Sequence, residues 1–146
     1  MKYLFYVLLV LLLTGCYKLD SSNPAPIEEA IFGQSKPATA ADYVGNFEAA
    51  DDCDQRGNTG KYAVSISAES STQFLLRNLA NFSRTASVVV TLNGNRELTI
   101  SRQTSAGGLV FEGVGVANSR NTLTINYTVR DSNGQTITCQ ATLQRQ

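Results

Sequence analysis

The sequence predicts an all-β fold, an antiparallel up-and-down meander of about eight strands that closes into a barrel. Beyond residue 42, apolar and polar residues alternate with a period of two, and short turns rich in asparagine and glycine separate the alternating segments. No segment longer than a turn has helical periodicity. A long meander accumulates twist and has open edges that pair with other chains, and closure removes both problems. A two-sheet β-sandwich is the alternative that the same pattern permits.

The last two predicted strands carry the clearest alternation. In residues 121–130 (NTLTINYTVR) every second residue is apolar, and residues 135–144 (QTITCQATLQ) repeat the pattern. Asn133 and Gly134 lie between them, and this pair is a strong signal for a tight hairpin. We therefore expect a hairpin with one buried face and one face rich in threonine.

Six further segments complete the predicted meander. They are residues 43–49, 61–69, 73–79, 85–92, 96–102 and 109–117. The last of these is interrupted by Gly113 and Gly115, and glycine inside a strand favours a bulge or a sharp bend in a curved sheet. The barrel domain is accordingly placed at residues 42–146.

The first 16 residues resemble the lipobox signal of bacterial lipoproteins. Lys2 precedes an apolar run that is too short to span a bilayer comfortably, and Thr14 and Gly15 then lead to Cys16. The resemblance implies that residues 1–15 are a signal peptide that is removed, and that Cys16 is lipidated. Several acyl chains make a durable bilayer anchor. An ordinary secretory signal and a retained transmembrane helix are the alternatives.

The residues after Cys16 indicate a tether and a location. Residues 16–41 contain all the prolines of the chain and little apolar periodicity, which predicts a flexible linker. In the lipoproteins that the signal resembles, aspartate directly after the cysteine tends to retain the protein at the inner membrane. Tyr17 occupies that position here, so the resemblance favours the outer membrane.

The two remaining cysteines are predicted to form a disulfide bond. Export places Cys53 and Cys139 in an oxidising compartment, and no C-x-x-C spacing favours a redox pair instead. Cys53 follows the first predicted strand, and Cys139 lies on the apolar side of the last one. A closed barrel makes the first and last strands neighbours and so allows this bond, which favours the barrel over the sandwich.

Residues 43–53 (YVGNFEAADDC) resemble the start of a lipocalin-type barrel, whose first strand carries a G-x-W signature. Gly45 matches the glycine, Phe47 stands where tryptophan is expected, and Arg145 is the candidate for the basic residue that packs over this aromatic ring. The later segments are similar to small uncharacterised lipocalin-like lipoproteins of Gram-negative bacteria. The resemblance implies a lipocalin-like binding module. The alternative is that Phe47 is an ordinary core residue.

The composition argues against catalysis, cofactors and metals. The chain has no histidine, which excludes a Ser-His-Asp arrangement and a histidine-based zinc site. The acidic residues Glu48, Asp51, Asp52 and Asp54 do not follow the spacing of a calcium loop, so we expect a solvated loop beside the disulfide. Basic and acidic residues balance at 12 each without a basic block, which makes nucleic acid an unexpected partner. We expect a protein that is not an enzyme.

Binding is the function that the sequence favours. The expected inward residues are apolar or aromatic with no inward charge, so a ligand in the barrel would be small and hydrophobic. The candidate ligand-binding residues are Tyr43, Phe47, Tyr62, Phe74 and Tyr127. The same residues would also serve a fully packed core. The second hypothesis is a structural or interaction protein of the cell envelope, which binds a protein or a glycan through the polar exterior of the barrel.

Overall fold

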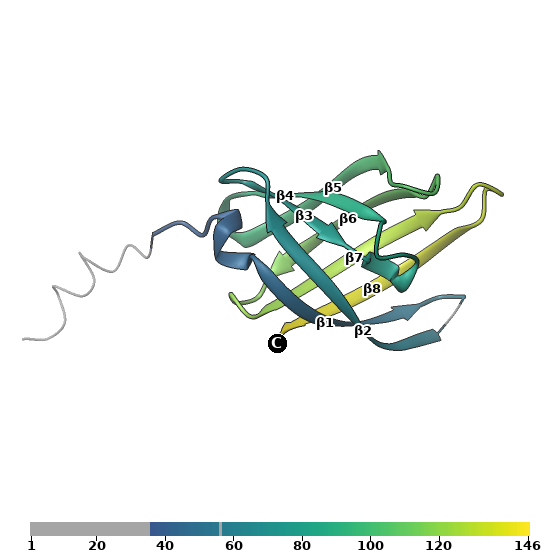
Figure 1. Ribbon diagram of the computed structural model, residues 1–146, viewed down its shortest axis with the longest axis horizontal. Coiled ribbons are helices and arrows are strands. Elements are labelled where there is room, and N and C mark those ends of the chain that lie inside the picture. The colour runs from purple at the N-terminus through teal and green to yellow at the C-terminus, as the bar shows by residue number, and fades with distance from the viewer. Residues whose placement is uncertain (1–35, 56) are drawn as a thin grey trace, which may run out of the picture. The chain divides into compact units, whose positions relative to one another are not determined.

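The protein is an eight-stranded antiparallel barrel in which each strand pairs with the next and β8 pairs with β1 (Figure 1). The computed structural model describes residues 36–146 with the exception of residue 56. Its strands are β1 (Gly45–Cys53), β2 (Gly57–Ala68), β3 (Gln73–Arg77), β4 (Ser87–Leu92), β5 (Glu97–Thr104), β6 (Val110–Ala117), β7 (Thr122–Arg130) and β8 (Thr136–Arg145). The predicted all-β meander and its closure are confirmed, and the fold is not a sandwich.

Three short 3₁₀ helices lie outside the strands, η1 (Ala40–Tyr43), η2 (Leu79–Asn81) and η3 (Gly94–Arg96). No helix among the described residues is long and apolar enough to cross a bilayer. The predicted signal peptide at 1–15, the lipidation site Cys16 and the linker up to residue 35 lie outside the described residues. Ala40, in the last part of the predicted linker, is buried, and its amide donates a hydrogen bond to Ser71 O (2.8 Å).

The predicted disulfide is confirmed, and it joins the two strands that close the barrel. Cys53 is the last residue of β1, and it lies directly opposite Cys139 in the register of β1 and β8. The first strand is therefore longer than the predicted segment 43–49. The bond fixes the closing pair of strands near the end of the barrel at which β1 ends.

Inward-pointing side chains of all eight strands fill the barrel. The largest fully buried side chains are Tyr43, Phe47, Phe74, Leu76, Leu79, Leu98, Ile100, Phe111, Leu123, Ile125, Tyr127 and Leu143. Tyr43 of η1 packs near Phe74 at one end, with ring centroids 6.1 Å apart. At the other end the segment 78–86 between β3 and β4, which includes η2, buries Leu79 and Ala80. Each end of the barrel is thus covered by a short irregular segment (Figure 1).

Gly113 and Gly115, where a bulge or bend was predicted, lie in β6 in regular register with β7, and the two backbones approach each other closely there. A Cβ atom at Gly113 would lie 2.5 Å from Asn126 O and 2.8 Å from Tyr127 Cβ, and one at Gly115 would lie 2.4 Å from Thr124 O. No side chain fits at these distances. Glycine is therefore required for the close approach of the two strands, which is how curved sheets often turn.

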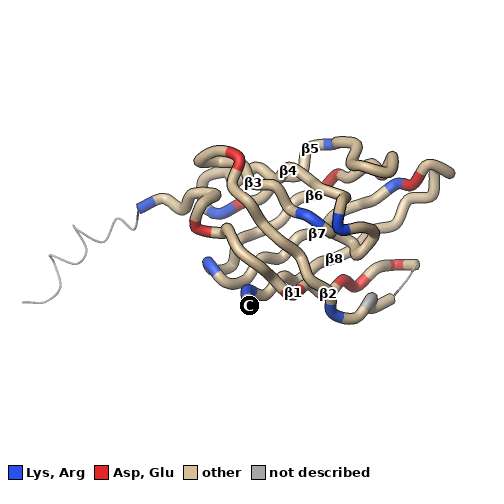
Figure 2. Tube along the Cα trace, viewed as in Figure 1, with Lys and Arg blue, Asp and Glu red and all other residues tan. Residues whose placement is uncertain are grey.

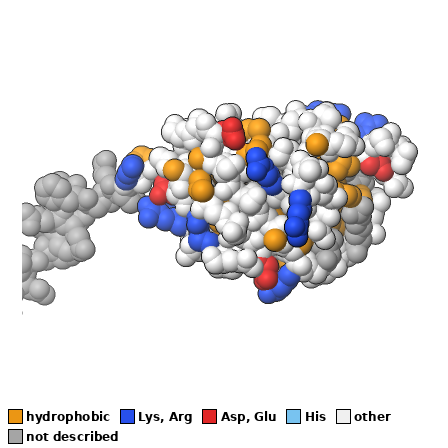
Figure 3. All heavy atoms as spheres, in the orientation of Figure 1, with side chains coloured by type: hydrophobic (Ala, Val, Ile, Leu, Met, Phe, Trp, Pro, Cys, Tyr) orange, Lys and Arg blue, Asp and Glu red, His pale blue; other side chains and the backbone are white. Residues whose placement is uncertain are grey.

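The outer surface is mixed in character. Basic and acidic residues are interspersed along the described part of the chain (Figure 2). On the face shown in Figure 3, apolar side chains form small separate groups between polar and charged ones. Of the large hydrophobic side chains on the described surface, Val114 of β6 is the most exposed, at 61%.

Candidate ligand-binding site

A carboxylate is buried inside the barrel. Asp51 lies on β1 and follows the inward alternation of Phe47, Ala49 and Cys53, so that only 1% of its surface is exposed. Two expectations from the sequence are therefore wrong: Asp51 does not belong to a solvated loop, and the interior is not free of charged residues. The cause is the length of β1, which continues to Cys53 and carries Asp51 inward by strand parity.

Two tyrosines hold one oxygen of this carboxylate. The Tyr62 hydroxyl donates a hydrogen bond to Asp51 Oδ2 (2.7 Å), and the Tyr127 hydroxyl donates to the same atom (2.9 Å). Asp51 Oδ1 is buried and has no hydrogen-bond partner among the described residues. An unpaired buried carboxylate oxygen is costly and rare in native proteins. The arrangement therefore leaves one strong acceptor unused inside the barrel.

Burial governs the protonation of the cluster. Desolvation raises the pKa of Asp51, and the hydrogen bonds from Tyr62 and Tyr127 oppose this rise. Burial also raises the pKa of Tyr62, and the bond to Asp51 adds to the rise. Within the described part of the chain, no lysine or arginine forms an ion pair with Asp51. The carboxylate accordingly lacks a counter-charge.

The segment 78–86 covers the cluster and is linked to it directly. The backbone amide of Ala80 donates a hydrogen bond to the Tyr62 hydroxyl (3.1 Å), which itself donates to Asp51. At the base of the segment, Asn78 Nδ2 donates to Ala63 O (2.7 Å). A movement of this segment would therefore break a bond to the cluster.

The backbone of the covering segment is strained. Asn78, Ala80 and Asn81 have φ values of 69°, 66° and 52°. Asparagine tolerates this left-handed region, but alanine has no side-chain hydrogen bond to offset the steric cost. Strain of this kind persists where the surrounding contacts impose it, and it is common at ligand clamps.

A small hollow lies beside the covering segment at the same end of the barrel. Its volume is about 70 Å³, and its lining residues are Phe82, Leu109, Val129, Asp131, Gln135 and Ile137. The hollow lies where Phe82 of the segment and Ile137 of β8 pack against the core as partly buried residues.

The five residues predicted to bind a ligand are all buried, and they divide into two groups. Tyr62 and Tyr127 converge on Asp51. Tyr43 and Phe74 pack together under η1, and Phe47 lies under Arg145 near the same end. A role for the five in ligand binding stays a prediction. Asp51 was not among the predicted binding residues. Its parity with Phe47, Ala49 and Cys53 in the sequence nevertheless indicates an inward position.

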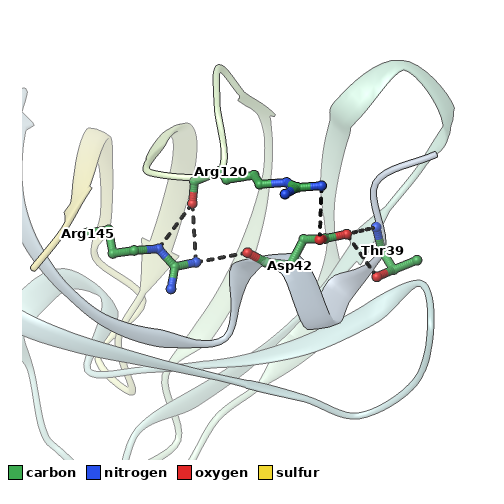
Figure 4. Close-up of polar contacts among 4 residues, drawn as sticks. All are labelled: Thr39, Asp42, Arg120 and Arg145. Carbon is green, nitrogen blue, oxygen red and sulfur yellow. Dashed lines mark hydrogen bonds and ion pairs between the residues drawn. The ribbon is translucent and has the colours of Figure 1, made fainter. Parts of the chain in front are cut away.

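Arg145 seals the end of the barrel that faces η1. Its guanidinium carbon lies 4.9 Å from the centroid of the Phe47 ring, as the predicted aromatic–basic pair requires. Its nitrogens donate to the backbone oxygens of Val44 (2.7 Å), Asp42 (2.9 Å) and Arg120 (3.2 Å). Figure 4 shows Arg145 bridging Asp42 and Arg120, whose side chains also form an ion pair (3.4 Å). Polar contacts hold this end of the barrel together, so the role of Arg145 here is structural.

The remaining acidic residues of the predicted cluster point outward and are dispersed. Glu48 forms an ion pair with Lys61 (2.6 Å), and Asp54 Oδ1 accepts a hydrogen bond from the Thr138 amide (3.1 Å). Among the described residues, no group of three or more cysteine, aspartate or glutamate side chains is arranged to hold a metal ion.

A shallow groove lies on the outer face of strands β5 to β8. Its volume is about 590 Å³, and the residues that line it are Thr99, Ile100, Ser101, Glu112, Gly113, Val114, Asn126, Tyr127, Thr128 and Thr138. Most of them are the outward residues of their strands, although Tyr127 of the interior cluster is also in the lining. Val114 is its most exposed large apolar residue.

Comparisons with known proteins place the chain by its fold. No protein-family model and no curated protein matches the sequence. A redesigned β-barrel is similar with a TM-score of 0.55 and 16% identity, covering 75% of this chain and 96% of its own. The redesigned barrel mFAP1, bound to DFHBI, has a TM-score of 0.53 at 16% identity, covering 74% and 99% of the two chains. A structural-genomics protein of unknown function from Bacteroides ovatus has a TM-score of 0.50 at 15% identity, covering 71% and 42%.

Proposed function

We propose that the protein is a non-catalytic binding module that takes a small, mostly apolar molecule at the barrel end covered by residues 78–86. The observation that carries the proposal is Asp51 Oδ1, which is buried in the interior and has no hydrogen-bond partner among the residues that the structure describes. In a core that serves packing alone, burying an apolar side chain would cost less free energy than burying an unsatisfied carboxylate. A bound molecule with a hydrogen-bond donor would supply the missing contact.

Binding would require the segment 78–86 to move. Leu79 and Ala80 occupy the space next to the cluster, and their withdrawal breaks the bond from the Ala80 amide to Tyr62. The left-handed strain at Ala80 reduces the cost of opening. The redesigned barrel mFAP1, which is similar in fold, is bound to DFHBI, which supports a barrel of this kind as a binding scaffold.

Binding rather than catalysis is proposed because the cluster lacks a second reactive group. Asp51 is the one carboxylate buried in the described barrel, and the groups bonded to it are tyrosine hydroxyls. Burial raises the pKa of Tyr62 and makes it a poor nucleophile. Paired acids of the glycosidase type need a second carboxyl across a cleft.

The module is proposed to be tethered to the outer membrane through acyl chains on Cys16. The support is the apolar run that ends at Thr14, Gly15 and Cys16, with Tyr17 after the cysteine. The test is metabolic labelling with a palmitate analogue. Label is expected on the wild-type protein and not on Cys16→Ser, and labelled Cys16→Ser would contradict the tether.

A direct test of binding uses 2-phenylethanol, a water-soluble molecule with one aromatic ring and one hydroxyl. Ligand-observed NMR is recorded on the processed full chain in lipid nanodiscs, with empty nanodiscs as background. Saturable binding is expected, and Asp51→Leu should abolish it because an apolar chain removes the acceptor. Val114→Ser, in the outer groove, is the matched control and should bind normally. Absence of saturable binding, or loss only in Val114→Ser, would contradict the proposal.

A second candidate function is docking of an envelope protein or a glycan on the outer groove. The specific observation is Val114, which is 61% exposed and lines the groove together with several threonine side chains and Asn126. Cross-linking of the exported protein in intact cells tests this function. Val114→Glu should remove a specific cross-linked product if the groove is an interface, and Val44→Glu, outside the groove, should leave it.

A further inference from the structure

We propose that the molecule bound at this end of the barrel carries a protonated amino group, and that Asp51 Oδ1 is its partner. This inference rests on the proposed binding function and names the ligand class. The expected ligand is a small amine with one short apolar or aromatic body. Three features of the cluster point to this ligand class: the direction of its hydrogen bonds, its charge, and the aromatic rings around it.

The directions of the hydrogen bonds make Asp51 an acceptor. The Tyr62 hydroxyl oxygen accepts a bond from the Ala80 amide, so its proton is free to be donated to Asp51 Oδ2. Tyr127 donates to the same oxygen. Both tyrosine protons thus stabilise the carboxylate form, and Oδ1 keeps its lone pairs without a donor. The missing partner is therefore a donor.

The charge of the cluster favours a cationic donor over a neutral one. The ion pairs of the described residues lie elsewhere and leave Asp51 without a counter-charge, while desolvation raises its pKa. A neutral hydroxyl would fill the hydrogen bond but would leave the buried charge uncompensated. An ammonium group fills both roles, because a charge-assisted bond is stronger and the pair is neutral. An anionic ligand would be repelled.

Aromatic rings around the carboxylate suit the same ligand. Tyr62 and Tyr127 both contact Asp51, and the ring of Phe111 lies 6.2 Å from that of Tyr127, centroid to centroid. Ring faces attract cations, and they also pack well against an apolar body. The hollow beside Phe82 lies at the same end and gives a bound molecule a place to begin displacing the segment 78–86.

The test compares three molecules that share a phenyl ring and a short chain: 2-phenylethylamine, 2-phenylethanol and 3-phenylpropanoate. Affinities are measured at neutral pH on the processed full chain in nanodiscs. The amine is expected to bind at least tenfold more tightly than the alcohol, and the carboxylate is expected not to bind. Asp51→Asn keeps the shape and removes the charge, so it should erase the preference for the amine. Asp54→Asn, which neutralises an exposed carboxylate at the same end, is the matched control and should keep it.

The outcomes separate the two proposals. Equal binding of amine and alcohol, or an amine preference that survives Asp51→Asn, would overturn the inference and leave the binding module standing. Failure of all three molecules to bind would overturn both. If Asp51→Asn does not fold, the pH dependence of amine binding by the wild-type protein tests the inference instead. Its affinity for the amine should fall on acidification as Asp51 is protonated, and an affinity that does not change would reject the pairing.

Discussion

The guanidinium of Arg145 lies over the ring of Phe47 and joins the last strand of the barrel to the first. The same group donates to backbone oxygens of Asp42 and Val44, at η1 and its C-terminal cap, and of Arg120, between β6 and β7. A Cβ atom at Gly45 would lie 2.8 Å from Arg145 Nη1, so the glycine makes room for this contact. The G-x-aromatic pattern and the distant arginine therefore form one structural unit.

Removal of this arginine should destabilise the protein strongly. Arg145→Ala is expected to lower the free energy of unfolding by about 2–4 kcal/mol, because hydrogen bonds from a charged group and a cation–π contact are lost together. Urea unfolding measures the change. Arg102→Ala is the control, since this arginine is exposed and its ion pair is long (3.9 Å), and it should cost less than about 0.5 kcal/mol. Equal effects of the two changes would contradict the role of Arg145.

The close approach of β6 to β7 at Gly113 should not tolerate a methyl group. Gly113→Ala places Cβ 2.5 Å from the backbone oxygen of Asn126, and backbone atoms of β7 cannot move aside easily. We expect a loss of stability of at least about 1–3 kcal/mol, as for overpacked cores. Gly94→Ala, where nothing lies within 4 Å, is the matched control and should be neutral or slightly stabilising. Thermal unfolding that ranks the two variants equally would argue against the close approach.

Loss of the disulfide should be costly. Cys53 and Cys139 are 86 residues apart in the sequence, and closing a loop of that length restricts the unfolded chain. Reduction, or replacement of both cysteines by alanine, is expected to lower stability by about 2–5 kcal/mol. Denaturation with and without a reductant measures the effect. The double-alanine variant should show no response to the reductant, and an unchanged wild-type melt would contradict the bond.

The stability of the barrel should depend on pH through Asp51. Burial raises its pKa in the folded state above the ordinary value of 3.8, so the folded state binds the proton more tightly than the unfolded state does. This tighter proton binding adds to the free energy of unfolding. The added stability is fully present below the ordinary pKa of 3.8 and is lost as the pH rises through the pKa of the folded state. The free energy of unfolding of Asp51→Asn should not show this decrease with rising pH. If the difference between the two proteins is constant with pH, Asp51 does not titrate as described.

Relief of the strain at Ala80 should stabilise the closed barrel and weaken binding. Glycine adopts a φ of 66° without steric cost, so Ala80→Gly is expected to raise stability by about 0.5–1 kcal/mol after its own entropy is counted. This added stability of the closed barrel must be overcome when the segment 78–86 opens. It therefore predicts about twofold to fivefold weaker binding of 2-phenylethylamine. Ala86→Gly, at a position without positive φ, should instead lower stability. Tighter binding by Ala80→Gly would contradict an opening step.

The period-two alternation was sufficient to predict the strands, because one face of each lies against the core and the other faces water. It placed the hairpin at Asn133 and Gly134 correctly. The expected oxidising compartment led to the pairing of Cys53 with Cys139, and this pairing favoured a closed barrel. The prediction ended β1 too early, because the acidic run after Ala50 is typical of a loop. Core burial outweighed that local preference and carried Asp51 inside.

The covering segment was not predictable from the sequence. Residues up to Leu79 continue the apolar pattern of β3, yet the strand ends at Arg77 and Leu79 turns inward. The left-handed conformation of Ala80 is supported by a bond from its amide to Tyr62, 18 residues away along the chain. Such tertiary contacts leave no local signal, so the site became visible only when the barrel was assembled.

The most direct test of binding at Asp51 is a map of backbone amide chemical shifts during titration with 2-phenylethylamine. The largest changes are expected at Tyr62, Ala80 and the rest of the segment 78–86, since these residues lie next to the carboxylate or must move when the amine reaches it. Changes confined to the outer groove around Val114, or no saturable change at all, would contradict a binding site inside the barrel.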